Sequence, residues 1–114
     1  MNNYLNGFDR QEVTFKANST IRQGATAKLI SASMVGLASV GSDFIGVCSL
    51  VRDDAASIVM RGYVQVAFTG TAPSVGFNKL TADGEGGVKV DANGRHFLVA
   101  DVDKINSTCG IIIN

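Results

Sequence analysis

The sequence is poor in the residues from which most catalytic sites are built. Its 114 residues include one histidine, two cysteines, one proline and no tryptophan. His96 is not accompanied by a Gly-x-Ser-x-Gly nucleophile motif, and no His-Glu-x-x-His, Cys-x-x-Cys or phosphate-loop pattern occurs. Because catalysis needs a nucleophile, a base and a group that stabilises charge, we expect a protein that is not an enzyme and uses no cofactor.

Acidic residues that could bind a metal ion or act as a pair lie in expected turns. The segment 83–87 lacks the spacing of a calcium-binding loop. Asp53, Asp54, Asp101 and Asp103 lie in or next to expected hairpin turns, where aspartate is favoured because its side chain bonds the local backbone. We therefore predict no metal site.

Clustered charge and long apolar runs are missing as well. Ten basic and ten acidic residues cancel and are spread along the chain, whereas nucleic-acid binding requires a clustered basic surface. No run approaches the roughly 20 apolar residues of a membrane span, and the N-terminus has neither the basic flank nor the apolar centre of a signal peptide. We expect no nucleic-acid or membrane partner, and a protein made and kept in a cytoplasm.

The two cysteines, Cys48 and Cys109, lie within apolar, strand-like segments. Cysteine in such a segment is usually a buried, reduced thiol in proteins of reducing compartments. We predict two free thiols, with a disulfide or a metal site as the alternative.

The residues that are plentiful favour an all-β fold. Short β-branched runs are separated by Gly, Asn, Asp and Ser. The central feature is a hairpin whose second arm, residues 58–68, alternates on its two faces, with a bend or bulge expected at Gly62. Further strands are predicted over residues 25–30, over 34–38, and over 12–17 with Val13, Phe15 and Ala17 inward.

The first arm of this hairpin, residues 44–51, is apolar on both faces. Such a strand is covered by its own core or by another subunit. Because two apolar faces are hard to bury in 114 residues, we predict a homo-oligomer, with a trimer as the leading hypothesis. The candidate subunit interface consists of Phe44, Ile45, Val47 and Val51.

Similar groups of residues recur along the chain at spacings of 51 or 53. We interpret residues 12–114 as a single β domain made of two similar hairpin-containing halves, about 24–67 and 75–114, with a two-residue insertion within 83–94. A small barrel or sandwich is expected. The alternative is coincidence between β-branched runs. The matching groups are Lys28-Leu29 with Lys79-Leu80, Phe44-Ile45 with Phe97-Leu98, and Ile58-Val59-Met60 with Ile111-Ile112-Ile113.

Residues 1–11 are polar and rich in asparagine, but they include Tyr4, Leu5 and Phe8. One interpretation is a frayed terminus. The other is an extended N-terminal arm that orders on a partner and uses these three side chains as anchors.

The order of the segments carries a family resemblance. After a first strand at 12–17 come Ile21-Arg-Gln-Gly-Ala-Thr-Ala-Lys-Leu29, Phe44-Ile-Gly-Val47, Ile58-Val-Met-Arg-Gly-Tyr-Val64, Gly76-Phe-Asn-Lys-Leu80 and Gly110-Ile-Ile-Ile113. From about residue 10 onward, this order resembles the small capsid decoration, or cement, proteins of tailed bacteriophages and prophages. The family's second Phe/Leu-Ile-Gly-Val motif stands here as Phe97-Leu-Val-Ala100, without the glycine.

The resemblance implies a barrel-like β domain, often trimeric, that binds the major capsid protein on the outside of an expanded phage head. It implies head stabilisation without catalysis or cofactor, with Tyr4, Leu5 and Phe8 as capsid-binding anchors. The protein, made in the bacterial cytoplasm, would then reside on the virion surface. Two alternatives remain open: another phage structural component, in the tail or baseplate, and a small β-barrel module that binds a peptide or sugar.

Overall fold

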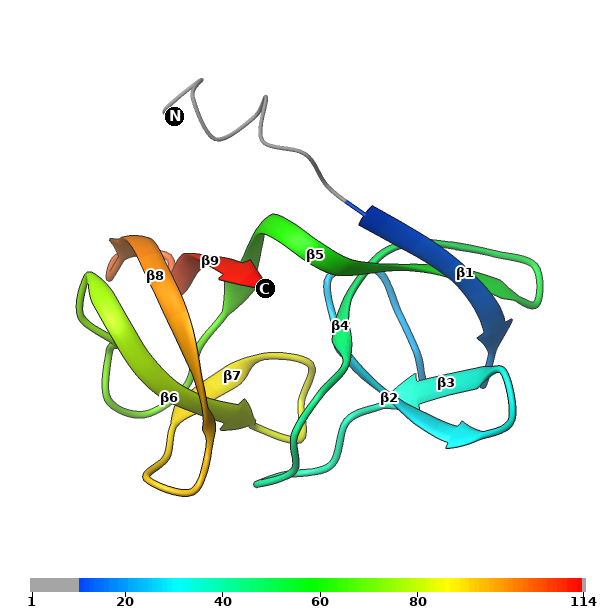
Figure 1. Ribbon diagram of the computed structural model, residues 1–114, viewed down its shortest axis with the longest axis horizontal. Coiled ribbons are helices and arrows are strands. Elements are labelled where there is room, and N and C mark those ends of the chain that lie inside the picture. Colours follow the sequence, from blue (N-terminus) through cyan, green and yellow to red (C-terminus); the bar gives the residue numbers. More distant parts are fainter. Residues whose placement is uncertain (1–10, 114) are drawn as a thin grey trace.

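The computed structural model describes residues 11–113, and these form nine β-strands and no helix (Figure 1). The prediction of an all-β fold is confirmed. No helix in this range is long and apolar enough to cross a membrane. The strands are β1 (Gln11–Ala17), β2 (Thr26–Ser31), β3 (Met34–Leu37), β4 (Gly46–Arg52), β5 (Ala55–Ala67), β6 (Gly76–Ala82), β7 (Val88–Val90), β8 (Arg95–Asp103) and β9 (Thr108–Ile113).

All nine strands belong to one mixed sheet with the order β1-β3-β2-β4-β5-β9-β8-β6-β7. Strand β1 pairs with β3 in parallel and also with β5 in antiparallel orientation. Strands β1, β3, β2, β4 and β5 therefore close into a ring, while the remaining strands extend the sheet from β5.

Strand β5 links the ring to the rest of the sheet. Residues up to Arg61 pair with β1 or β4, whereas the pairing with β9 begins at Gly62. Gly62 has a φ of 110°, in the region that favours glycine, and β5 curves as it passes from one part of the molecule to the other (Figure 1). The bend lies at the predicted glycine.

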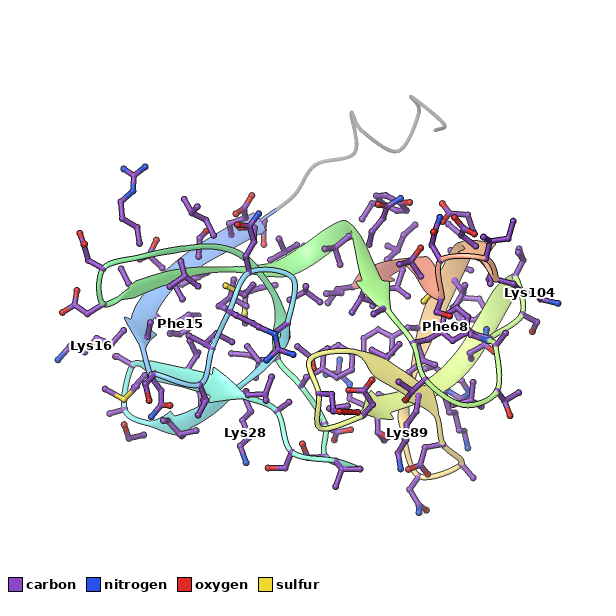
Figure 2. All side chains as sticks on the ribbon, turned by 180° about the vertical axis from the view of Figure 1, so that it is seen from behind. Phe15, Lys16, Lys28, Phe68, Lys89 and Lys104 are labelled. Carbon is purple, nitrogen blue, oxygen red and sulfur yellow. The ribbon has the colours of Figure 1, made fainter. Side chains whose placement is uncertain are left out.

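Two clusters of buried side chains fill the molecule. One cluster lies within the ring and includes Val35, Cys48 and Ile58. The larger cluster draws on β5 to β9 and also on the segment before β4, where the Phe44 ring stacks on Phe97 with centroids 5.1 Å apart. Figure 2 shows Phe15 pointing into the ring, and Phe68 belongs to the larger cluster.

The first residues of strand β4 are covered on both faces by these two clusters. Val47 belongs to the larger cluster and its neighbour Cys48 to the cluster in the ring. The single chain thus buries both faces of the first part of this arm, whereas Leu50 near its end is 48% exposed.

The first predicted strand is present, but its inward face is only partly covered. Phe15 and Ala17 pack against the ring cluster, whereas Val13 is 44% exposed. Val13 pairs with buried Ile58, so it lies on the core side at the open end of the ring. Val13 therefore lies on the predicted inward face but is not covered there.

Loops tie the ring to the other strands. The amide of Thr26 donates to the carbonyl of Gly86 at 2.9 Å, and the Arg22 guanidinium donates to the carbonyl of Glu85. In return, the amide of Gly41 donates to the carbonyl of Ala82 at 2.9 Å. These bonds connect the two parts independently of β5.

Candidate interaction surface

Four apolar side chains lie side by side across one face of the sheet. Residues that are directly opposite on antiparallel strands share a face. The register pairs β6 with β8, β8 with β9, and β9 with β5 at four consecutive positions, which we call the outer row: Phe77, Leu98, Ile112 and Tyr63.

The outer row lies on the face away from the core. Val99 and Ile111, which alternate with row residues along β8 and β9, are completely buried in the larger cluster. Phe77 is 74% exposed, and Val75, just before β6, is 70% exposed. Leu98 and Ile112 are half-buried. The β6 end of the row is thus an apolar surface open to a partner.

Opposite charges flank the outer row. On one side, two residues from the row along their strands, lie three exposed basic residues: Arg61 on β5, Lys79 on β6 and His96 on β8. Lys79 and His96 are directly opposite in the register of β6 and β8. On the other side lies the acidic residue Asp101 of β8. It follows the β-bulge after Val99 and is opposite Gly110 of β9, which is two residues from Ile112 of the row. The surface therefore has a basic edge and an acidic edge.

Tyr63 lies flat over Gly110 at the β5 end of the row. A Cβ at Gly110 would come within 2.6 Å of the Tyr63 ring, so only glycine leaves space for it. The phenol donates a hydrogen bond of 2.7 Å to Asp101. Burial, and secondarily this bond, raise the pKa of Tyr63 above its ordinary value. This end of the row is held in place, whereas Phe77 is free to make new contacts.

A second exposed apolar feature is the turn between β8 and β9, where Ile105 is 94% exposed. Asp103 accepts hydrogen bonds from the amides of Ile105 and Asn106 and from the Asn106 side chain. The bonds from Asn106 lower the pKa of Asp103 below its ordinary value. The turn is therefore ordered by local backbone chemistry, as expected for an aspartate in this position.

The structure does not bring the predicted interface residues together on a surface. Phe44 is 2% exposed and Val47 is equally buried, while Ile45 and Val51 are partly buried against the ring cluster. They contribute to the cores of the single chain. The predicted anchors Tyr4, Leu5 and Phe8 lie outside the described residues.

The expected free thiols are present. Cys48 and Cys109 are both buried and free, and burial raises the pKa of both, that of Cys109 to about 11. Within residues 11–113, no three His, Cys, Asp or Glu side chains form a group that could hold a metal ion.

The acidic segment 83–87 is a turn between β6 and β7. Asp83 accepts hydrogen bonds from the amides of Glu85 and Gly87 at 2.7 and 2.9 Å. Its carboxylate therefore serves the local backbone.

Sequence reasoning missed the outer row. The alternation of Phe77 and Lys79 with Asn78 and Leu80 was a usable signal for an exposed face on β6. The alignment of Phe77 with Leu98, Ile112 and Tyr63 depends on strand order and register, which the sequence pattern does not specify.

No protein-family model matches this chain, and a search of curated proteins found no significant match.

Proposed function

We propose that this protein is a structural, non-enzymatic component of a phage virion that binds the outer surface of the capsid and stabilises the head lattice. The order of segments described above supports the capsid assignment. Two exposed apolar side chains support a binding role. Phe77, in the outer row, is 74% exposed, and Val75, just before β6, is 70% exposed, while a well-packed core lies behind the sheet. A preformed apolar surface binds with little ordering cost.

We further propose that the domain consists of two similar halves that share β5. Strand β2 pairs with β3 and β4, and β4 pairs with β5; in the same way β6 pairs with β7 and β8, and β8 pairs with β9. The N-terminal strand of each set also matches: β1 pairs with β3 in parallel, and Phe68, just after β5, forms a parallel bridge with Val88 of β7. Both halves then have the small-barrel architecture, the second less completely closed than the first.

Details of the pairing support this correspondence. The pair Thr26 and Val47 recurs 51 residues later as Phe77 and Leu98. The register shifts between Cys48 and Leu50 in β4, and again 51 residues later in β8. The β4–β5 turn has two residues between the last paired residues and the β8–β9 turn has four, so the two additional residues lie in the latter turn. Under this proposed correspondence the insertion lies in the β8–β9 turn and not within 83–94.

Head stabilisation would operate by mass action. A protein that binds only the assembled lattice lowers the free energy of that state relative to its dissociated subunits. The major capsid protein is the proposed partner, and Tyr4, Leu5 and Phe8 remain proposed anchors in addition to the outer row. Trimer formation remains a proposal that rests on the resemblance, since Phe44 and Val47 of the predicted interface are buried within the chain.

The proposal is tested with purified protein and heads of the encoding phage from which the protein has been removed. We expect it to co-sediment with the heads saturably and to raise the temperature at which they release DNA. A Phe77→Ser, Val75→Ser double variant should bind at least tenfold more weakly. A Val40→Ser variant is the control, because Val40 is 66% exposed on a loop outside the outer-row strands. Binding to tails and not to heads would favour a tail or baseplate role and reject the capsid assignment.

A further inference from the structure

We propose that the outer row is also a contact between two copies of this chain, which pack face to face with their strands antiparallel across the contact. This inference concerns the free protein and is tested without heads; because the same face is proposed to bind the capsid, dimer formation and head attachment would compete.

The distribution of charge around the outer row favours a second copy of the chain as the partner and fixes the orientation of that copy. The basic edge carries Lys79, His96 and Arg61, and the acidic edge carries Asp101, on opposite sides of the same apolar row. A two-fold axis that runs along the row places the basic edge of each copy over the acidic edge of the other. A two-fold axis parallel to the strands would superpose like charges. The face is thus complementary to itself in one orientation.

The same orientation stacks each row residue on its counterpart. Because the axis runs along the row, the exposed Phe77 of one copy meets Phe77 of the other. Aromatic rings that meet in this way gain from offset or edge-to-face packing as well as from burial.

The size of the face limits the affinity. Four strands about 4.8 Å apart and some six residues of about 3.3 Å each cover on the order of 300–400 Å² per copy. Stable interfaces bury about 800 Å² per partner. We therefore expect a weak dimer that forms at tens to hundreds of micromolar and weakens as salt screens the two charged edges.

Two measurements test this contact. Sedimentation equilibrium of the full chain should show reversible dimers that weaken at least tenfold in Phe77→Ser and in Lys79→Glu, and not in the control Leu50→Ser, which alters a 48% exposed leucine on β4. A short bis-maleimide should cross-link two copies of a Lys79→Cys variant at concentrations where dimers form, whereas a Leu50→Cys variant should not be cross-linked. A linker is used because facing sheets lie about 10 Å apart, beyond the reach of a disulfide. Circular dichroism checks that each variant is folded. Because the substituted side chains are exposed, we expect the fold to be unchanged.

Several outcomes overturn the proposal. A strict monomer at several hundred micromolar, or dimers unaffected by both Phe77→Ser and Lys79→Glu, would show that the face does not pair. Dimers that appear only after deletion of residues 2–10 would show that the chain's own N-terminal segment occupies the face. Failure to bind heads bears only on the capsid proposal, since heads are absent from these measurements.

Discussion

Replacing Gly46 by alanine should destabilise the fold by about 3 kcal/mol. Gly46 begins β4, where the strand passes between the two core clusters, and a Cβ there would lie 2.2 Å from the carbonyl oxygen of Val59 and 2.8 Å from Cγ2 of Ile58. Carbon–oxygen contacts normally exceed about 3.2 Å, so β4 and β5 would have to separate by about 1 Å. Overpacking typically costs about 1–3 kcal/mol, and each weakened backbone hydrogen bond about 1 kcal/mol more.

The assay is urea denaturation followed by circular dichroism, together with thermal melting, where the loss corresponds to a decrease in Tm of about 10–15 °C. Gly36→Ala is the matched control. Its Cβ would contact side-chain atoms and no backbone, Oγ1 of Thr20 at 3.1 Å and Cγ2 of Ile30 at 3.2 Å, and these need to shift by only a few tenths of an ångström, which the hydrogen bonds of Thr20 to Asn18 and Leu37 can follow. We expect the control to change stability by less than about 1 kcal/mol. If Gly46→Ala were as stable as the wild type, the close approach of β4 and β5 would be refuted.

Four further predictions concern the thiols, Tyr63 and the N-terminal segment. Burial raises the pKa of Cys109 from 9.0 to about 11. This shift contributes about 2–3 kcal/mol to the free energy of unfolding below pH 9, and the contribution is lost as the pH rises from 9 to 11. The variant Cys109→Ala should therefore show a flatter dependence of the unfolding free energy on pH in this range. Cys48 and Cys109 should react with thiol reagents only after unfolding, and rapid labelling of the native protein would contradict their burial. Tyr63→Phe should cost about 1 kcal/mol through loss of the bond to Asp101, with unchanged stability as the contrary result. Deleting residues 2–10 should leave folding intact and weaken attachment to heads at least tenfold, whereas undiminished binding would mark this segment as a frayed end.

Local pattern was sufficient to predict most strands. The alternation in residues 58–68 and the glycine at 62 predicted a long bent strand, because a buried face requires a period of two and a sharp bend favours a residue without Cβ. Cover on both faces of residues 44–51, by the chain's own core or by another subunit, was anticipated as well. The residues that cover Val47 and Cys48 were not, because the two clusters combine segments far apart in the sequence.

Long-range register was beyond the reach of the sequence. The parallel pairing of Lys16 with Met34 joins segments whose patterns suggested only short strands. The outer row likewise combines single residues from four strands, none of which is distinctive alone. Under the proposed correspondence of two halves, the insertion would lie in a different turn from the one that the matches at spacings of 51 and 53 predicted, because apolar strands can be matched two residues out of register without changing which face is buried.

The central claim is that this chain binds the outside of a phage head. Cryo-electron microscopy of heads incubated with the purified protein tests it most directly. We predict ordered density on the outer capsid surface into which residues 11–113 fit as a unit, absent from heads incubated with buffer. Bare heads at saturating protein, or density confined to the tail, would contradict the proposed function.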